Sequence, residues 1–256
     1  MECCDVYCGD NTEVLKLFPN DSIDLIVTSP PYGSLRKYNG FNFDLTALST
    51  ELYRVIKGGG VIVWIVKDQI KNGKSLLIPW KHVTALTEAG FGLYDTMIWE
   101  KPSPAAPTEG RYYDVFEYMF IFCKGNKPRV LNLLEDRPNK STGSVAKKES
   151  RSNKEERVYK DGKRVVKEFS RRFNVWHISR DHNKTKHSAV FPYQLAKDHI
   201  LTWSNPGDLV VDIFAGSGTT NLAAMDTGRK TIAIEISKEY CEIIKDRLKN
   251  ARIIIE

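Results

Sequence analysis

Short apolar runs alternate with segments of helical periodicity along most of this chain. The run at residues 61–66 ("VIVWIV") is continuous, and the run at residues 23–27 is apolar except for Asp24, which is typical of strands buried on both faces. Further strands are predicted at residues 4–7, 93–99, 115–122 and 230–237, and helices at residues 11–18, 45–56, 80–89, 191–203 and 239–250. Residues 208–228 have the pattern of a strand, a glycine-rich turn and a helix. This alternation predicts an α/β fold in which helices cover both faces of a mixed, mostly parallel sheet.

Two details of this pattern are specific enough to be checked. The apolar residues of the predicted helix 45–56 form one stripe, and we expect the triple glycine at residues 58–60 to end that helix. Strands 93–99 and 115–122 are close enough in sequence to be antiparallel neighbours.

The composition indicates one well-filled core, with or without an inserted module, in 256 residues. No run approaches the roughly 20 apolar residues of a membrane span, and the first ten residues lack the pattern of a signal peptide, so we expect a cytoplasmic protein without a membrane partner.

The five cysteines are scattered, which favours neither disulfides nor zinc. His177, His182 and His187 recur every five residues, a spacing that fits no common metal site, so no metal is expected.

Positive charge is concentrated in one segment. Residues 137–172 hold thirteen Lys and Arg against five Asp and Glu, a net +8, whereas the whole chain carries only +6. The segment contains no Leu, Ile or Trp, so it contributes little to a core. Such a segment is either a nucleic-acid contact or a solvated charged loop, and the first is favoured.

The strand at residues 23–27 is followed by "TSPPYG", Thr28 to Gly33. Two prolines make this loop stiff and remove two N–H donors, so what remains at Pro30 and Pro31 is a cluster of acceptors. Acceptors beside the ring of Tyr32 suit a flat ligand with an exocyclic amine, although a simple surface loop is the favoured interpretation of this string on its own.

A second landmark follows a later strand. "VVDIFAGSGTT" brings Asp212 to a strand end and then supplies Gly216 and Gly218, and such turns bind ligands at the carboxyl ends of strands. The turn fits neither the phosphate-binding loop nor the dinucleotide fingerprint. Glu235, near the end of the next strand, could accept hydrogen bonds from a ribose, so a nucleoside without a pyrophosphate is indicated, and S-adenosylmethionine is the natural candidate.

These landmarks, in this order, resemble the amino-methylating DNA methyltransferases of restriction–modification systems, in the permuted order called the beta class. "SPPY" at Ser29 to Tyr32 is similar to the family's catalytic element, and "FAGSG" at Phe214 to Gly218 to its cofactor element. "GDNTEVLKLFPNDSIDLIVTSPPYG", "ELYRVIKGGG", "IWEKPSP", "EYMFIFCKG" and "HSAVFPYQLA" also agree. The resemblance implies a Rossmann-like S-adenosylmethionine-dependent methyltransferase fold.

The resemblance also implies the site residues. Catalytic residues would be Ser29, Pro30, Pro31 and Tyr32, with Tyr32 stacking on a flipped base while Ser29 and the Pro30 carbonyl accept hydrogen bonds from its amine. Cofactor-binding residues would be Asp10, Phe191, Asp212, Phe214, Ala215, Gly216, Ser217, Gly218, Thr219 and Glu235. Asp68 either relays a proton from Ser29 or caps a helix, and the cap is favoured.

The implied organisation is a catalytic half (residues 1–125), a basic target-recognition insert (126–174) and a cofactor-binding half of the same domain (175–256). The implied reaction is methylation of cytosine N4 in double-stranded DNA, because the family's "SPPY" mostly accompanies cytosine. Adenine N6 is the alternative, and an RNA methyltransferase or a non-catalytic nucleic-acid-binding module is less favoured. A cognate restriction endonuclease remains open as a second partner, and so does the oligomeric state.

Overall fold

The computed structural model describes residues 4–31, 44–102, 110–145, 158–160, 163–179 and 192–255. The chain divides into two compact units. The larger consists of Met1–Asn132 together with Val175–Glu256, and the smaller is Leu133–Asn174. No helix in the described part of the chain is both long and apolar enough to cross a bilayer.

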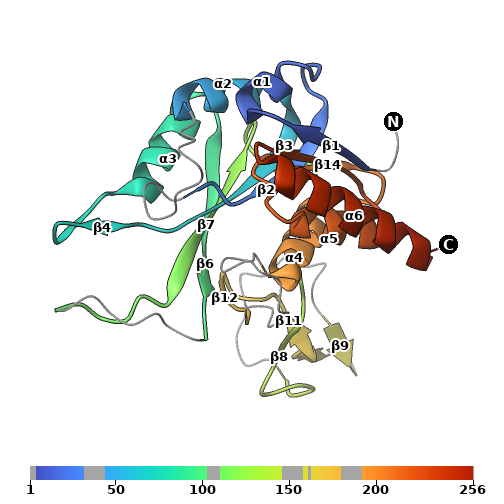
Figure 1. Cartoon of the computed structure of the whole chain (residues 1–256). Coiled ribbons are helices and arrows are strands. Elements are labelled where there is room, and N and C mark those ends of the chain that lie inside the picture. Colours follow the sequence, from blue (N-terminus) through green and yellow to red (C-terminus); the bar gives the residue numbers. More distant parts are fainter. Residues whose placement is uncertain are drawn as a thin grey trace. The chain divides into compact units, whose positions relative to one another are not determined.

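An eight-stranded sheet forms the centre of the larger unit (Figure 1). In spatial order its strands are β1 (Cys4–Cys8), β14 (Lys230–Glu235), β13 (Leu209–Asp212), β2 (Ile23–Thr28), β3 (Ile56–Val66), β7 (Phe116–Cys123), β6 (Gly92–Glu100) and β12 (Val175–His177). The five strands from β1 to β3 are parallel, β7 is antiparallel to both β3 and β6, and β12 is parallel to β6. The predicted mixed, mostly parallel sheet is thereby confirmed, as is the antiparallel pairing of β6 with β7.

The helices form two layers. Helices α1 (Asn11–Leu15), α2 (Leu45–Val55) and α3 (Ile78–Glu88) contact one another in sequence, and so do α4 (Tyr193–Trp203), α5 (Thr219–Asp226) and α6 (Lys238–Ile255). Figure 1 shows the first group in blue to teal and the second in orange to red, on opposite sides of the sheet. Because both faces are covered, all six residues of β2 are buried, as its run, apolar apart from Asp24 and Thr28, predicts.

The expectation for the triple glycine was wrong. Helix α2 ends at Val55, and β3 begins at Ile56 and runs through Gly58, Gly59 and Gly60. Gly59 has φ +74°, and a Cβ at Gly60 would lie 2.9 Å from the Ile56 side chain. The pairing of β3 with β2 shifts register here, so these glycines allow a bulge within the strand.

The described part of the smaller unit contains two antiparallel strand pairs. They are β8 (Arg137–Pro138) with β11 (Phe169–Ser170), and β9 (Val158–Lys160) with β10 (Lys163–Val165). The unit begins at Leu133, seven residues after the start predicted for the insert. Residues 126–132 belong to the larger unit, where the Arg129 N–H donates to the Gly59 carbonyl over 2.8 Å.

Candidate active site

The two sequence landmarks meet at one edge of the sheet. Strands β2 and β13 are parallel neighbours, with Ile26 opposite Val211, although they lie far apart in the sequence. Both strands therefore end at the same edge, so the loop Ser29 to Pro31 and the turn that begins after Asp212 start side by side. Ligands of open α/β sheets bind at this edge.

A hydrogen bond joins the two strand ends directly. The Thr28 hydroxyl donates to Oδ1 of Asp212 over 2.7 Å, and both side chains are buried. Thr28 was not among the predicted site residues. The available signal was a hydroxyl as the last residue of an otherwise apolar strand, which needs a polar partner once it is buried.

Asp212 lies in an environment that favours its protonated form. Burial raises its pKa to about 6, and the nearby Glu235 carboxylate adds to the rise. Hydrogen bonds from Thr28, from Thr220 and from the Phe214 N–H act in the opposite direction, but they do not outweigh burial. A carboxyl group perturbed in this way at a strand end is typical of a functional site.

We expect Thr28→Val to lower the free energy of unfolding, because it removes a hydrogen bond to Asp212. The valine fills the same volume but leaves the buried carboxylate with one donor fewer, at a cost of about 1–3 kcal/mol. The loss of stability should be larger above pH 6, where Asp212 is ionised. Urea unfolding checks the result, with Thr28→Ser as the control that retains the hydroxyl. A valine variant as stable as the serine variant at pH 8 would contradict this role.

The glycine turn after β13 leads into a helix with an open N-terminus. Gly216 and Gly218 have φ of +53° and +76°, and a Cβ at Gly218 would lie 3.1 Å from Ile244. Gly218 is the N-cap of α5, so no side chain caps the first N–H groups of that helix. The buried Thr219 hydroxyl has no hydrogen-bond partner among the described residues. Free N–H groups and an unpartnered hydroxyl suit a carboxylate such as that of a methionine moiety.

Glu235 holds the glycine turn in place. Its two carboxylate oxygens accept hydrogen bonds from the Gly216 N–H at 2.8 Å and the Ser237 N–H at 2.9 Å. Ser217 is bound from α6, whose Arg247 donates to its carbonyl and hydroxyl. Ala215 is buried, and Phe214 is half-buried with its ring 6.3 Å from that of Trp64. Glu235 therefore has a structural role beside the predicted contact with a ribose.

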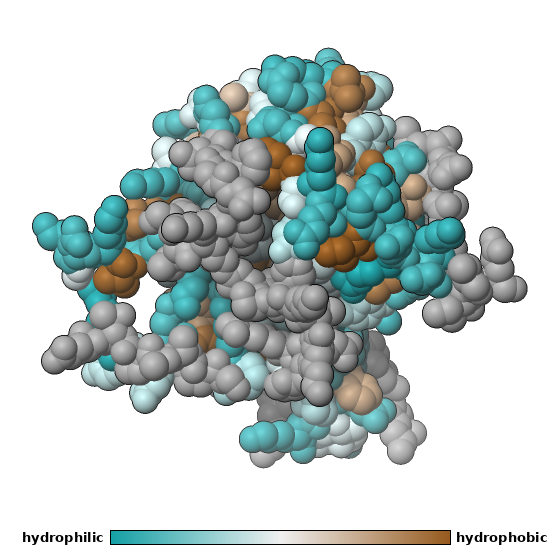
Figure 2. Space-filling view, in the orientation of Figure 1, coloured by the Kyte–Doolittle hydropathy of each residue, from teal (hydrophilic) through white to brown (hydrophobic). Residues whose placement is uncertain are grey.

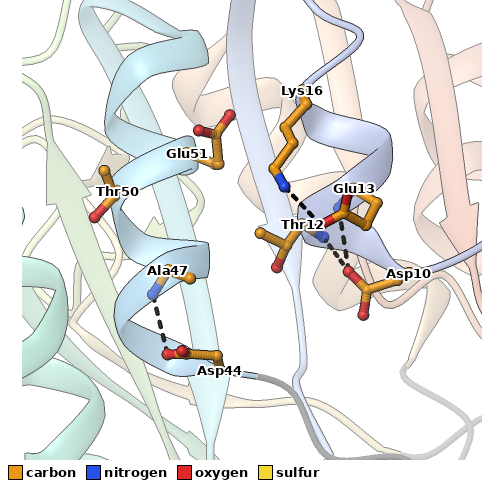
Figure 3. Close-up of a pocket in the computed structure, with 8 residues that line it drawn as sticks. All are labelled: Asp10, Thr12, Glu13, Lys16, Asp44, Ala47, Thr50 and Glu51. Atoms are coloured by element: carbon orange, nitrogen blue, oxygen red, sulfur yellow. Dashed lines mark hydrogen bonds and ion pairs between the residues drawn. The ribbon is translucent and has the colours of Figure 1, made fainter.

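Asp10 lies at the same edge, after β1. Cys8 pairs with Glu235 in the parallel ladder, and the Gly9 N–H donates to the Glu235 carbonyl over 2.9 Å. Oδ1 of Asp10 caps α1 by accepting from the Thr12 and Glu13 N–H groups. Asp10 is one of the residues that line a hollow of about 490 Å³ between α1 and α2 (Figure 3). The hollow is lined by Asp10, Thr12, Glu13, Lys16, Asp44, Ala47, Thr50 and Glu51.

The other predicted site residues and the histidines follow here. Tyr32 and Phe191 lie outside the described residues, as do His182 and His187. His177 pairs with Glu100 at 3.1 Å, and the described residues contain no cluster that could hold a metal ion.

Asp68 forms the contacts of a helix cap. It accepts a hydrogen bond from the Ile78 N–H, which begins α3, and others from the Gln69 N–H and the Ser75 hydroxyl. Burial alone would raise its pKa, but these hydrogen bonds outweigh burial and lower it. The side chain is thus a carboxylate that fixes the start of a helix, as the favoured alternative predicted.

Comparisons with known proteins show the family to which this chain belongs. A family model described as "DNA methylase", for the N6 and N4 amino-methyltransferases, matches residues 23–246. The chain belongs to this DNA methylase family. It is 48% identical over 242 residues to the orphan methyltransferase M.BamHII of Bacillus amyloliquefaciens, covering 91% of each chain.

Two solved structures are similar to this chain over nearly its whole length. A protein of Thermus thermophilus in complex with S-adenosyl-L-methionine has a TM-score of 0.64 and 27% identity, covering 96% of this chain and 93% of the other. The PvuII cytosine-N4-specific DNA methyltransferase has a TM-score of 0.69 and 23% identity, covering 95% and 86%. The fold is thus that of the S-adenosylmethionine-dependent DNA methyltransferases, and S-adenosylmethionine is the cofactor of this chain.

Proposed function

We propose that this DNA methyltransferase transfers the methyl group of S-adenosylmethionine to the N4 amine of a cytosine flipped out of double-stranded DNA. The observation that carries the proposal is the adjacency of the Ser29–Pro30 acceptors to the glycine turn, joined by the hydrogen bond from Thr28 to Asp212. Any amine held by the first loop lies beside a ligand held by the second.

The cofactor supplies an electrophilic methyl group, and the chain positions a weak nucleophile against it. The lone pair of an exocyclic amine is delocalised into the base, so its nitrogen attacks poorly. The Ser29 hydroxyl and the Pro30 carbonyl accept the two amine hydrogens and favour tetrahedral geometry at nitrogen, which localises that lone pair in the transition state. Tyr32 stacks on the base, and the stiffness of Pro30–Pro31 maintains the alignment.

The cofactor contacts follow from the same edge of the sheet. We assign the methionine part to Asp212, to the turn from Phe214 to Gly218 and to Thr219 at the N-terminus of α5. Glu235 contacts the ribose, Asp10 the adenine amine, and Phe191 lies near the cofactor. The open N-terminus of α5 and the unpartnered Thr219 hydroxyl support the first of these assignments.

The basic insert, residues 126–174, is proposed to recognise the target sequence. In its described part the charged side chains are partly paired, Lys167 with Glu135 at 3.3 Å and Arg172 with Asp136. Arg137, which lies over the ring of Phe173, adds a further positive charge. An excess of basic residues suits contacts with DNA phosphates.

Cytosine is favoured over adenine by Ser29 as the first residue of "SPPY" and by the similarity in fold to an enzyme named as cytosine-N4-specific. Both bases present an exocyclic amine as donor, so adenine N6 is the second candidate. Membership of the DNA methylase family argues against an RNA substrate and against a non-catalytic module.

Nucleoside mass spectrometry tests the assignment. Plasmid DNA is incubated with the purified protein and S-adenosylmethionine and then digested to nucleosides. The expected product is 4-methylcytosine. Accumulation of 6-methyladenine instead would retain the mechanism and overturn the base assignment, and DNA without any methylated base would overturn the proposed reaction.

A further inference from the structure

A small hairpin projects from the edge of the sheet at which β2 and β13 end, here called the catalytic edge. It consists of β4 (Ile70–Lys71) and β5 (Lys74–Ser75), which pair antiparallel. The two residues between them, Asn72 and Gly73, have φ of 51° and 72°. Positive φ at both positions is the geometry of a tight type I′ turn, so the hairpin is a defined element with a fixed tip.

The hairpin begins at the same edge of the sheet as the loop from Ser29 to Pro31. It follows β3, which is parallel to β2 with Trp64 opposite Thr28, so β3 ends where Ser29 begins its loop. Asp68 anchors its base by accepting from the Ser75 hydroxyl and from the first N–H of α3. Arg111 donates to the Gly73 carbonyl over 2.7 Å and ties residues 110–115 to the tip. In Figure 1 the hairpin and this green segment extend toward the same side of the sheet, away from α6.

The surface of these two segments, residues 67–82 and 110–116, is basic and aromatic. Its basic residues are Lys67, Lys71, Lys74, Lys81 and Arg111, and its acidic residues are Asp68 and Asp114. Both acids are engaged, Asp68 as the cap and Asp114 with Lys67 at 2.7 Å.

Three lysines of this surface, Lys71, Lys74 and Lys81, are exposed and form no ion pair with the described part of the chain. The side chain of Tyr112 is 98% exposed and that of Tyr113 is 60% exposed. Figure 2 shows hydrophilic residues beside hydrophobic ones at the left edge of the view, where Figure 1 places the hairpin. Exposed tyrosines next to a basic residue, here Arg111, are typical of surfaces that bind nucleic acid.

The hairpin also carries a local conflict. Lys71 and Lys74 are direct cross-strand partners, so two like charges flank a two-residue turn. Like charges in this position destabilise a hairpin. A local cost without a compensating contact within the chain is expected where a ligand supplies the compensation, and here that ligand must carry closely spaced negative charges.

We propose that Lys71 and Lys74 bind the phosphates of the substrate DNA close to the flipped base. This contact lies outside the basic insert, and the inference rests on the proposed function. The hairpin holds the duplex backbone near the catalytic edge, while the insert remains the element proposed to read the sequence. Contacts to phosphates position a protein on DNA without carrying sequence information.

The test is the salt dependence of DNA binding by the double variant Lys71→Ala/Lys74→Ala. Fluorescence anisotropy with a random-sequence duplex of about 30 base pairs measures the electrostatic part of binding, which does not depend on sequence. Each phosphate contact contributes about 0.9 to the slope of log K against log salt. We therefore expect the slope to fall by about 1.8 and the affinity at low salt to decrease, with S-adenosylmethionine binding by calorimetry unchanged.

The matched control is Lys230→Ala/Lys249→Ala, which removes the same charge from two exposed positions away from the hairpin, one at the start of β14 and one on α6. A hairpin variant that retains the slope of this control overturns the inference. That outcome leaves the proposed function intact as long as the unaltered protein methylates DNA. Absence of methylation by the unaltered protein contradicts the proposed function itself, and the mass spectrometry detects it independently.

Discussion

Replacing Ser29 with alanine is expected to slow methyl transfer on the order of 100-fold, the effect of removing one hydrogen-bonding group aimed at a reacting atom. In the proposed mechanism the hydroxyl accepts an amine hydrogen that becomes more acidic as the nitrogen attacks, so its contribution would be larger in the transition state than in the bound substrate. Cofactor binding should be unchanged, because the glycine turn and α5 are not altered. Single-turnover methylation and calorimetry with S-adenosylmethionine separate the two effects.

Ser22 provides a matched control for this change. It directly precedes β2, at the opposite end of the strand from Ser29, and its hydroxyl donates to the Pro19 carbonyl over 2.7 Å. Ser22→Ala removes the same group far from the catalytic edge and should leave the transfer rate unchanged. A Ser29→Ala rate within about twofold of the Ser22→Ala rate would show that the hydroxyl takes no part in the chemistry.

Replacing Asp212 with asparagine is expected to stabilise the fold at neutral pH. The pKa of this carboxyl is raised from 3.8 to about 6, so the folded protein binds its proton more tightly than the unfolded chain does. The stabilisation from the protonated form is fully present below pH 3.8 and is lost as the pH rises through 6. Asparagine does not titrate. The stability of the Asp212→Asn variant relative to the unaltered protein should therefore rise by about 2 kcal/mol between about pH 4.5 and 7.5.

Urea unfolding at several pH values measures this difference, and Asp246→Asn on the exposed surface of α6 is the control expected to show a flat profile. A flat profile for Asp212→Asn as well would mean that the buried carboxyl is not destabilising when ionised. The same variant should bind S-adenosylmethionine more weakly if Asp212 contacts the cofactor. Gain of stability with loss of function is the usual result at a functional site that retains a costly group.

The periodicity of the chain determined most of the elements. Strand β2 is buried because its run is mostly apolar, and the two loops that follow β2 and β13 were identifiable by residue type alone. Local signals failed at the triple glycine, which interrupts a strand and not a helix. Glycines are needed there because strand β2 and Arg129 pack closely against this backbone, and neither contact is visible in a short stretch of sequence.

The sequence by itself determined that this chain has a stiff acceptor loop, a glycine turn at a strand end and a concentrated positive charge. Only the tertiary structure decided that β13 pairs with β2, that Thr28 binds Asp212 and that Glu235 holds the backbone of the glycine turn. It also decided that Lys71 and Lys74 oppose each other beside the catalytic edge. The physical reason is that hydrophobic periodicity specifies which face of each element is buried, whereas the order of strands in the sheet follows from packing between segments distant in the chain.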